Sequence, residues 1–294
     1  MEVFIGLPAY NEEKNLPKIL EQLNELNYNI IVCDDGSSDK TNEIAKKFNV
    51  NLIEHKQNLG YGASIKSIFQ QAKQLHADIL VTFDSDGQHD VNDIKNIIEP
   101  ILNNNSDIVI GSRFLNKKNH IPKYRKTGIN VITKITNSTI NQKITDSQSG
   151  FRAYSKKSLE KIIPTNSGMG ISTEILIKAS EKDLKIEEIP IVISYEGETS
   201  THNPITHGSE VIASTIKYIA IKRPLTFFGI PCLIFFIIGG IFGYITIENY
   251  IDDGYLNTNL AIISASLLFL SIILLITIII IVTIITVIQE NKNN

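Results

Sequence analysis

Tryptophan is absent from the 294 residues, and cysteine occurs only twice. Cys33 falls in a predicted strand and Cys232 in a long apolar run, so we expect no disulfide between them. Charged residues are missing from two stretches, Leu225–Ile247 with 23 residues and Leu260–Ile288 with 29. Helices of these lengths would reach roughly 34 Å and 43 Å, while the apolar core of a bilayer is about 30 Å thick. The lack of charge argues against two buried core helices and predicts two membrane spans, the second tilted or extended into the headgroups.

Lysine and arginine are also missing from the loop that would connect the two spans, which carries only acidic charges. Basic residues precede the first span instead, and positive charge favours the cytoplasmic side of a membrane. The basic residues are Lys217, Lys222 and Arg223, and the acidic ones are Glu248, Asp252 and Asp253. The first residues hold only a five-residue apolar run, so we expect no signal peptide. The pattern predicts a multi-pass protein of the cell membrane whose N-terminal domain and C-terminus are cytoplasmic.

Composition divides the chain into four regions. We expect a cytoplasmic domain over residues 1–205 and an amphipathic juxtamembrane helix over residues 206–223. The second region includes the run Val211–Ile221, which is suited to the membrane interface. A two-helix transmembrane region then covers residues 224–289, and residues 290–294 form a cytoplasmic tail.

Short apolar runs alternate with amphipathic stretches through the first 110 residues. The runs predict strands at Val3–Leu7, Ile30–Cys33, Val50–Ile53, Ile79–Phe83 and Ile108–Ile110. The stretches between them predict helices at Glu12–Leu26, Asp39–Phe48, Gly62–Leu75 and Asp90–Leu102. This alternation is typical of an α/β domain with a Rossmann-like, mostly parallel sheet and helices on both faces.

Polar, acidic and glycine-rich turns follow all five predicted strands. In chain order they are PAYNEE, DDGSSD, NLGYG, DSDGQ and GSRF. Ligands of open α/β sheets bind beyond the carboxyl ends of the strands, where such turns meet. The five turns together therefore predict a binding site at one edge of the sheet.

Crowded carboxylates in the fourth turn predict a divalent cation. Asp84, Asp86 and Gln88 offer the oxygen ligands that suit Mg2+ or Mn2+, with positions left for phosphate oxygens. An EF-hand loop does not fit, because its sixth position would be His89 and its twelfth Lys95. A phosphatase with an aspartate nucleophile in a DxDG motif is an alternative, although that motif usually opens its domain.

The remaining turns suit a nucleotide. Tyr10 can lie against a base, Glu12 can accept hydrogen bonds, and Asp35 can pair with donors of the base or the ribose. Gly60 and Gly62 allow the backbone to approach a ligand where a helix starts.

Taken together, these turns resemble the inverting glycosyltransferases of family 2, which have the GT-A fold. The resemblance rests on GLPAYNEEKNL, VCDDGSSDKT, NLGYGAS, VTFDSDGQHD, DIVIGSRF and DSQSGFRAY, in the order of the family, over roughly the first 155 residues. Within the family the sequence is similar to the polyprenyl-phosphate sugar synthases, such as dolichyl-phosphate mannose synthase. The resemblance implies metal-dependent transfer of one hexose from a nucleotide sugar to a polyprenyl or dolichyl phosphate, with inversion.

The resemblance also implies roles for individual residues. Those expected to bind the nucleotide sugar are Pro8, Tyr10, Glu12, Asp35, Asp84, Ser85, Asp86 and Arg113. Those expected to hold Mg2+ or Mn2+ are Asp84, Asp86 and Gln88, with Asp86 as the principal ligand. Those expected to act in catalysis are Asp86, Arg113, Arg125 and Arg152. Ser149 and Arg152, in the SGFR motif, would belong to an acceptor-side loop.

A phosphate acceptor agrees with the cations that the sequence provides. A phosphate monoester is largely ionised at neutral pH and needs no general base, whereas a hydroxyl acceptor does. Arg113, Arg125 and Arg152 are available to meet its charge, and Lys123 and Lys126 flank Arg125. The donors that we consider are UDP-glucose, UDP-N-acetylglucosamine and GDP-mannose.

Two features depart from the dolichyl-phosphate mannose synthases. The loop after the last strand reads SYEGETSTHNPITHG, in which His202 and His207 stand where basic residues are usual. The chain has two spans instead of none or four. The absence of tryptophan excludes the QxxRW signature of processive polysaccharide synthases, so transfer of a single sugar is preferred.

A helical segment follows Arg125 in the sequence. Its apolar face would lie either in the membrane interface or against the core. The positions on that face are Ile129, Ile132, Ile135, Thr136, Ile140 and Ile144.

Two other functions remain open. A family 2 transferase could glycosylate a lipid or sugar hydroxyl, with Glu174 or Asp146 as the general base. A silent membrane adaptor could have kept the nucleotide fold, although a protein without catalysis has little use for crowded carboxylates. The expected partners are a nucleotide sugar, a polyprenyl or dolichyl phosphate and the lipid bilayer, with no nucleic acid; a homo-oligomer is compatible with the sequence.

Overall fold

The computed structural model describes residues 1–116, 119, 121–193, 213, 216–217, 219–221 and 223–293. The chain divides into two compact units, Met1–Thr215 and Ile216–Asn294. The loop with His202 and His207, as well as Lys222 and most of the predicted juxtamembrane helix, lies outside the described residues. The region boundaries inferred from composition stay predictions.

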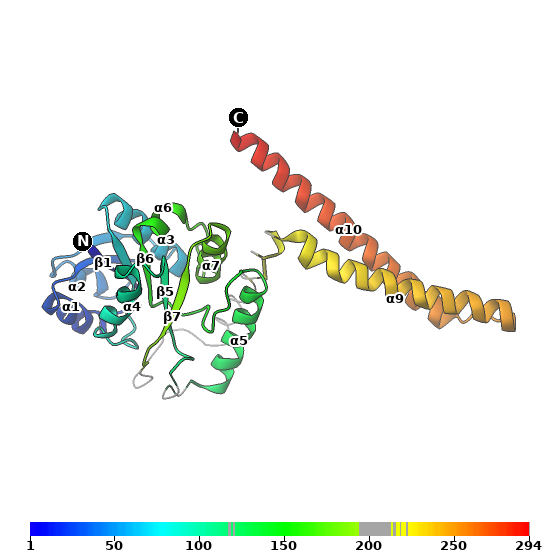
Figure 1. The fold of residues 1–294 in the computed structure, drawn as a ribbon, viewed down its shortest axis with the longest axis horizontal. Coiled ribbons are helices and arrows are strands. Elements are labelled where there is room, and N and C mark those ends of the chain that lie inside the picture. Colours follow the sequence, from blue (N-terminus) through cyan, green and yellow to red (C-terminus); the bar gives the residue numbers. More distant parts are fainter. Residues whose placement is uncertain are drawn as a thin grey trace. The chain divides into compact units, whose positions relative to one another are not determined.

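A seven-stranded sheet forms the centre of the N-terminal unit, with strand order β3-β2-β1-β4-β6-β5-β7. The strands are β1 (Val3–Ala9), β2 (Asn29–Asp34), β3 (Asn51–Glu54), β4 (Ile79–Thr82), β5 (Ile108–Ser112), β6 (Arg152–Ser155) and β7 (Ile186–Pro190). Strand β6 runs antiparallel to both β4 and β5, and the other described pairings are parallel. The prediction of a mostly parallel α/β sheet is confirmed (Figure 1).

Helices cover both faces of this sheet. They are α1 (Leu16–Glu25), α2 (Thr41–Ala45), α3 (Tyr61–Gln74), α4 (Asp93–Leu102), α5 (Lys123–Asn137), α6 (Lys156–Lys161) and α7 (Ile171–Glu181). Helices α1, α2 and α4 begin two to four residues later than predicted, because residues before them form turns that bond to other loops. One such bond joins the backbone N–H of Glu12 to Oγ1 of Thr41 at 2.8 Å.

Alternating residues of β1 face opposite layers, as in any strand. Ile5 and Leu7 belong to a core that also holds the apolar residues of α1 and α4. Gly6 faces α3, where a Cβ atom would lie 2.3 Å from Cγ2 of Ile68. Helix α3 can therefore lie against the sheet only because residue 6 has no side chain.

Beyond Ile110, strands β6 and β7 and helices α6 and α7 were not predicted from the sequence, whereas α5 was. Strand β6 has only four residues and starts at a buried arginine, so it has no apolar run to reveal it. The expected helix after Arg125 is α5, and Ile132 and Thr136 on its predicted face are buried in the unit. Ile140 and Ile144 are also buried but lie past the end of the helix. The face therefore packs into the domain at these positions.

The C-terminal unit is a hairpin of two helices, α9 (Pro224–Asp253) and α10 (Thr258–Asn293). Helix α9 is capped by Gly254, whose φ of 67° is the left-handed conformation common at helix ends. The helices pack antiparallel, as two hydrogen bonds between them show. Oγ of Ser264 donates to the carbonyl of Gly239 at 2.8 Å, and Oγ of Ser271 donates to the carbonyl of Cys232 at 3.0 Å.

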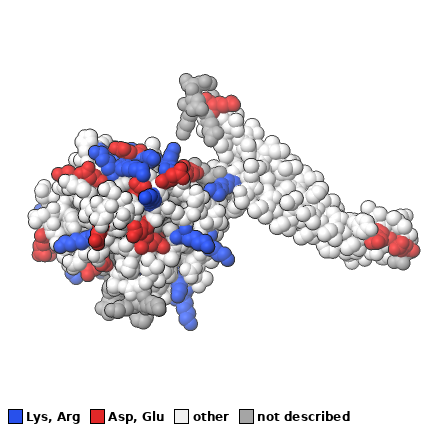
Figure 2. Space-filling model, in the orientation of Figure 1, with Lys and Arg blue, Asp and Glu red and all other residues white. Residues whose placement is uncertain are grey.

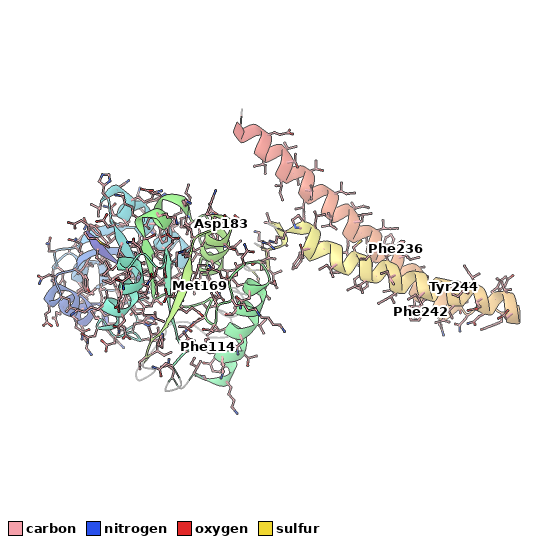
Figure 3. All side chains as sticks on the ribbon, in the orientation of Figure 1. Phe114, Met169, Asp183, Phe236, Phe242 and Tyr244 are labelled. Atoms are coloured by element: carbon pink, nitrogen blue, oxygen red, sulfur yellow. The ribbon has the colours of Figure 1, made fainter. Side chains whose placement is uncertain are left out.

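Both helices are long and apolar enough to span a membrane. The candidate spans are Pro224–Asp252 and Thr258–Ile288, with mean hydropathies of 2.4 and 3.4. In the most apolar 18-residue stretch of each helix only 6% and 11% of the residues are buried, so most of this apolar surface is exposed. The hairpin carries almost no charge along its length (Figure 2), and Phe236 and Tyr244 project outward from α9 (Figure 3). A soluble core helix would be mostly buried, whereas this surface suits lipid.

Candidate active site

The polar turns meet at one edge of the sheet. Strands β1, β2 and β4 lie side by side in parallel register, with Ala9 opposite Asp34 and Gly6 opposite Thr82. Their carboxyl ends therefore face the same edge. Strand β6 is antiparallel and starts at that edge, where Oγ1 of Thr82 donates to the carbonyl of Gly150 at 2.7 Å. This brings the SGFR motif beside the acidic turn, although some 65 residues separate them in the sequence.

Asp84 is held on three sides. Its Oδ1 accepts a hydrogen bond from the hydroxyl of Tyr61 at 3.1 Å, and its Oδ2 lies 3.7 Å from Nε2 of His89. On the third side a Cβ atom at Gly150 would lie 2.2 Å from Oδ2, so only glycine fits there. Burial by itself would raise the pKa of Asp84, but His89, Tyr61 and the charge of Arg113 hold it below its usual value. Asp84 is therefore a fixed, ionised carboxylate at neutral pH.

Asp86 lies in a region of excess negative charge. Burial, together with the nearby charge of Asp84, raises the pKa of Asp86 to about 6, although its Oδ1 accepts the backbone N–H of Gln88 at 3.0 Å. Near pH 7 both carboxylates are ionised and repel each other. A bound cation would remove this repulsion.

The acidic turn fits a metal ion that is shared with a substrate. Among the described residues no three His, Cys, Asp or Glu side chains gather to hold a metal by themselves. Two carboxylates and one amide form a sparse shell, and Mg2+ commonly takes one or two carboxylates and completes its shell with water and phosphate oxygens. The donor set of Asp84, Asp86 and Gln88 therefore agrees with Mg2+ or Mn2+ bound together with a diphosphate, and the assignment of these three ligands stays a prediction.

Asp35 follows β2 and organises the loop before α3. Its carboxylate accepts hydrogen bonds from the backbone N–H groups of Leu59 at 3.0 Å and Gly60 at 2.8 Å, and Oδ1 lies 2.6 Å from Nδ1 of His55. The same loop packs on Gly36, whose φ is 70° and where a Cβ atom would lie 2.5 Å from the backbone of Gln57. The DDG and NLG motifs are therefore one structural unit.

The first turn joins the turn after β2. The backbone N–H of Asn11 donates to Oγ of Ser37 at 2.9 Å, beside Tyr10, which is half-buried. Burial raises the pKa of Glu12 to about 7; a hydrogen bond from Asn15 lowers it, and the charge of Asp86 adds to the increase. Glu12 therefore shares an electrostatic environment with the acidic turn, as a common ligand site requires.

Pro8 and Ser85 connect neighbouring strand ends. Oγ of Ser85 is buried and donates to the carbonyl of Pro8 at 2.6 Å. The hydroxyl thus ties the end of β1 to the turn after β4, which gives Ser85 a positioning role at the edge of the site.

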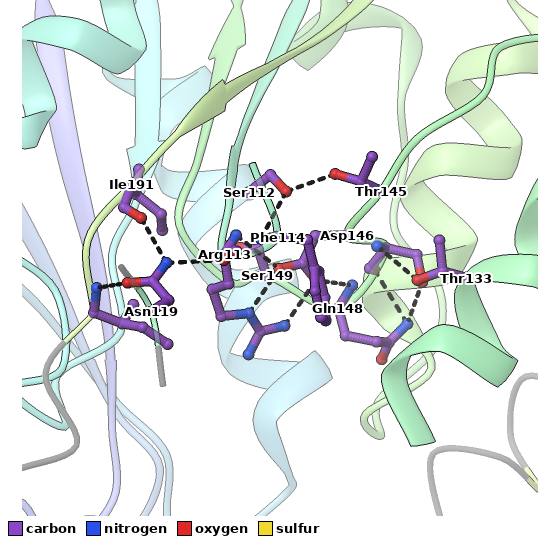
Figure 4. Close-up of polar contacts among 12 residues, drawn as sticks. Ser112, Arg113, Phe114, Asn119, Thr133, Thr145, Asp146, Gln148, Ser149 and Ile191 are labelled. Atoms are coloured by element: carbon purple, nitrogen blue, oxygen red, sulfur yellow. Dashed lines mark hydrogen bonds and ion pairs between the residues drawn. The ribbon is translucent and has the colours of Figure 1, made fainter. Parts of the chain in front are cut away.

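Arg113 is paired with a buried carboxylate (Figure 4). Its Nε and Nη2 donate to the two oxygens of Asp146 at 2.6 Å and 2.8 Å, and its backbone N–H donates at 3.2 Å. Burial alone would raise the pKa of Asp146, but Arg113 holds it below its usual value. The pair fixes the guanidinium close enough to Asp84 to lower that residue's pKa, so Arg113 lies beside the acidic turn.

Arg152 and Arg125 occupy different environments. Arg152 is 1% exposed and donates to three carbonyls, those of Ser147 at 2.7 Å, Ser149 at 2.8 Å and Ser172 at 2.9 Å. This geometry supports a positioning role that joins the SGFR loop to α7, instead of the direct catalytic role expected for it. Arg125, on α5, is half-buried, and its charge lowers the pKa of Asp86.

The two carboxylates considered as general bases are occupied. Asp146 is bound to Arg113, as described above. Glu174 is fully buried and accepts from the backbone N–H groups of Thr165 at 2.9 Å and Asn166 at 2.7 Å, and it pairs with Lys178. Burial by itself would raise the pKa of Glu174, but Lys178 and the other hydrogen bonds hold it below its usual value. An efficient base has a free lone pair and a pKa near the operating pH, so the occupied oxygens and lowered pKa values disfavour both residues in that role.

Several residues of the site were not singled out from the sequence for these roles. Tyr61, at the start of α3, and His55 and His89 contact the predicted site residues, but a single aromatic or histidine residue has no spacing that marks it in the sequence. His89 directly follows Gln88, which was a signal that could have been used. Nδ1 of His89 and Oγ of Ser149 are buried without a hydrogen-bond partner in the described structure. Such atoms are rare in folded proteins and here border the site from the two motifs that meet at Asp84.

Comparison with known proteins gives a family match and named relatives. Residues 4–163 match the family model described as glycosyl transferase family 2. The chain is 37% identical to the UDP-N-acetylglucosamine–dolichyl-phosphate N-acetylglucosaminyltransferase of Methanococcus voltae, over 66% of this chain and 86% of that protein. It is 34% identical to the dolichol-phosphate mannosyltransferase of Pyrococcus furiosus, over 65% of this chain and 56% of that protein.

Solved structures share the fold. A mycobacterial protein of known crystal structure superimposes with a TM-score of 0.59 and covers 73% of each chain at 17% identity. At this identity the likeness concerns the fold alone, and it supports the architecture inferred from the sequence.

Proposed function

Because the chain belongs to glycosyltransferase family 2, we propose that this enzyme transfers one sugar from a nucleotide sugar to dolichyl phosphate at a membrane. The named relatives from Methanococcus voltae and Pyrococcus furiosus act on dolichyl phosphate or dolichol phosphate by name, with different sugars. Membership of this family also favours a glycosyltransferase over the DxDG phosphatase and the silent adaptor.

The donor would lie along the sheet edge. Pro8, Tyr10, Glu12 and Asp35 line the turns that we assign to the nucleoside, and the acidic turn lies next to them. Asp84, Asp86 and Gln88 would hold Mg2+ or Mn2+, which when bound neutralises the donor diphosphate and the charge that develops as it departs. Arg113 would face the same phosphates, held in place by Asp146.

With Glu12, whose pKa is raised to about 7, assigned to the nucleoside, the state of the two other candidate bases is the observation that carries the choice of acceptor. Asp146 and Glu174 are both tied to cations and both have lowered pKa values. A hydroxyl acceptor would need such a base, whereas the phosphate of dolichyl phosphate is already an anion at neutral pH. An anionic acceptor can approach the site only if cations offset its charge. Arg113 and Arg125 both lie close enough to lower the pKa values of carboxylates in the acidic turn.

The bond changes follow from this placement. A phosphate oxygen of the acceptor attacks the anomeric carbon from the face opposite the nucleotide, so a new C–O bond forms with inversion. The bond between the anomeric carbon and the donor diphosphate breaks, and its electron pair leaves with the nucleoside diphosphate. No proton needs to be removed from the acceptor, so the protein contributes by positioning and charge stabilisation.

Helices α9 and α10 would keep the enzyme at the membrane that holds its lipid acceptor. Lys217 and Arg223 precede α9, while the C-terminal end of α9 carries acidic residues only and the turn after it is uncharged. This charge distribution supports a cytoplasmic N-terminal unit. A cysteine introduced by Asn257→Cys should react with a membrane-impermeant maleimide on intact cells. Reaction only after lysis would indicate the opposite orientation.

The direct test is a transfer assay. Detergent-solubilised protein with Mg2+ and dolichyl phosphate would be supplied separately with UDP-glucose, UDP-N-acetylglucosamine and GDP-mannose, and the lipid followed by mass spectrometry. We expect one donor to give a lipid whose mass rises by a single sugar with its phosphate retained. Asp86→Asn should remove this product, whereas Asp90→Asn, an exposed acidic residue of the same loop, should leave it unchanged.

A different product would decide against the proposal. Nucleotide release with transfer to a lipid that carries no phosphate would indicate a hydroxyl acceptor. No change of any donor in the presence of Mg2+ or Mn2+ would contradict transfer itself.

A further inference from the structure

A buried chain of three polar side chains lies behind the turn after β2. Asp35 and His55 are in contact through Oδ1 and Nδ1 at 2.6 Å, and Nε2 of His55 lies 2.9 Å from Oγ of Ser67 on α3. The side chains of Asp35 and His55 are only 4% and 10% exposed. The sequence places these three residues 20 and 12 positions apart, so only the fold brings them together.

The chemistry of the three groups sets the direction of their hydrogen bonds. An ionised carboxylate can only accept, so Nδ1 of His55 carries a proton and donates it to Asp35. Nε2 then accepts from the hydroxyl of Ser67 when the ring is neutral and donates to it when the ring is protonated, with Sγ of Cys33 3.7 Å from the same nitrogen. Ser67 thus fixes the ring, and the ring fixes Oδ1 of Asp35.

This arrangement uses most of the acceptor capacity of Asp35. A carboxylate has about four lone-pair positions. Within the part of the chain that the structure describes, His55 and the N–H of Leu59 occupy the two on Oδ1, and the N–H of Gly60 occupies one on Oδ2. Among the described residues, one acceptor position on Oδ2 is left without a donor.

We propose that His55 and Ser67 orient Asp35 so that its carboxylate offers the nucleobase a single hydrogen-bond acceptor position. The donor nucleotide is then a uridine diphosphate sugar. This inference rests on the proposed function, since it specifies the nucleobase of the same donor site. His55 is a positioning residue in this proposal, because it acts through Asp35 without touching the base.

The pairing edges of the four bases differ in their hydrogen-bond donors, so a single acceptor position on Asp35 would discriminate among them. Uracil presents one N–H between two carbonyls, which matches one acceptor. Guanine presents two adjacent N–H donors and needs both oxygens of a carboxylate, so one donor would be left unpaired. Adenine and cytosine present a ring nitrogen lone pair beside their amino group, which faces the carboxylate unfavourably. An unpaired buried donor typically weakens binding on the order of 10- to 100-fold.

The test measures nucleotide binding without an acceptor. Isothermal titration calorimetry would compare UDP with GDP on the full-length, detergent-solubilised protein in Mg2+. We expect UDP to bind at least about 10-fold more tightly than GDP. Equal affinity, as expected if Asp35 reads the ribose, would overturn the inference, and so would tighter binding of GDP.

Variants of His55 test whether it sets this preference. His55→Ala removes one donor from Oδ1, so UDP should bind about 10-fold more weakly and the ratio between UDP and GDP should shrink to within about threefold. His55→Asn returns an amide donor near the position of Nδ1 and should restore most of the ratio. His76→Asn, at an exposed histidine after α3, is the matched control and should change nothing. A ratio that is the same in His55→Ala and wild type, with both folded by circular dichroism, would refute the role of His55.

Outcomes of the transfer assay remain separate. If UDP bound more tightly than GDP but no sugar was transferred to dolichyl phosphate, the proposed function would be contradicted and this inference supported. Efficient transfer from GDP-mannose alone would support the proposed function and overturn this inference.

Discussion

Replacing Asp146 by asparagine separates a structural carboxylate from a catalytic base. In the structure Asp146 is fully buried and accepts three hydrogen bonds from Arg113, two from the guanidinium and one from the backbone. The side chain of Arg113 is 17% exposed, so Asp146→Asn would leave a mostly buried cation without its counter-ion. Breaking a buried pair on one side costs about 3–5 kcal/mol.

This free energy predicts a measurable loss of stability. For a unit of this size about 2–4 °C of Tm is lost per kcal/mol, so the thermal transition of the N-terminal unit should fall by roughly 6–20 °C. Circular dichroism of the detergent-solubilised protein would follow the transition. Turnover should also fall, because the displaced guanidinium would no longer face the donor phosphates, but its dependence on pH should keep its shape.

A surface pair provides the control. Nζ of Lys46 lies 3.1 Å from Oε2 of Glu54, and both side chains are half-exposed. Exposed pairs are screened by solvent and contribute little to stability, so Glu54→Gln should change the Tm by no more than about 4 °C. If Asp146→Asn instead kept the wild-type Tm, lost turnover and changed the pH profile, Asp146 would act as a base. The reasoning toward a phosphate acceptor would then be wrong.

Two further predictions concern the acidic turn. In metal-free protein the folded pKa of Asp86, about 6, lies above its usual 3.8, so the stabilisation it contributes is complete below about pH 3.8 and is lost as the pH rises through about 6. Asp86→Asn should therefore raise the Tm at pH 8 and leave it nearly unchanged at pH 4, in melts with a chelator; equal shifts at both pH values would contradict the burial of an uncompensated charge. Gly150→Ala should lower turnover at least about tenfold, because the new Cβ would displace Asp84, and misplacing a reacting group by about 1 Å can lower a rate on the order of 100-fold. Gly128→Ala, where a Cβ would meet nothing within 4 Å, should keep full turnover in the same transfer assay, and equal losses in both variants would refute the steric argument.

The first part of the fold was predictable because its signals are local. Each of the first five strands is an apolar run that ends in a polar turn, and the runs Val3–Leu7 and Ile30–Cys33 lie inside β1 and β2. Helix starts were less accurate, because residues such as Glu12 bond to loops that are distant in the sequence. Strands β6 and β7 were missed because short or polar strands depend on their neighbours for burial.

The candidate site was predictable as a set of turns and not as a set of contacts. Asp84 and Asp86 stand out in the sequence because like charges crowd there. The buried position of Arg152 could not be predicted, since an arginine next to a phosphate site and one that binds backbone carbonyls have the same local sequence. The same holds for Asp146, which looks like a free carboxylate until Arg113 is seen beside it.

The sequence by itself determined the properties that depend on neighbouring residues: the apolar runs of the first strands, the two helices able to span a membrane, and the acidic turn. Only the tertiary structure decided which polar groups face a ligand and which are consumed inside the protein. Asp35 shows the reason, because the three donors that occupy its carboxylate come from His55, Leu59 and Gly60, about 20 to 25 residues away. The number of acceptor positions left for a ligand is therefore a property of the folded chain.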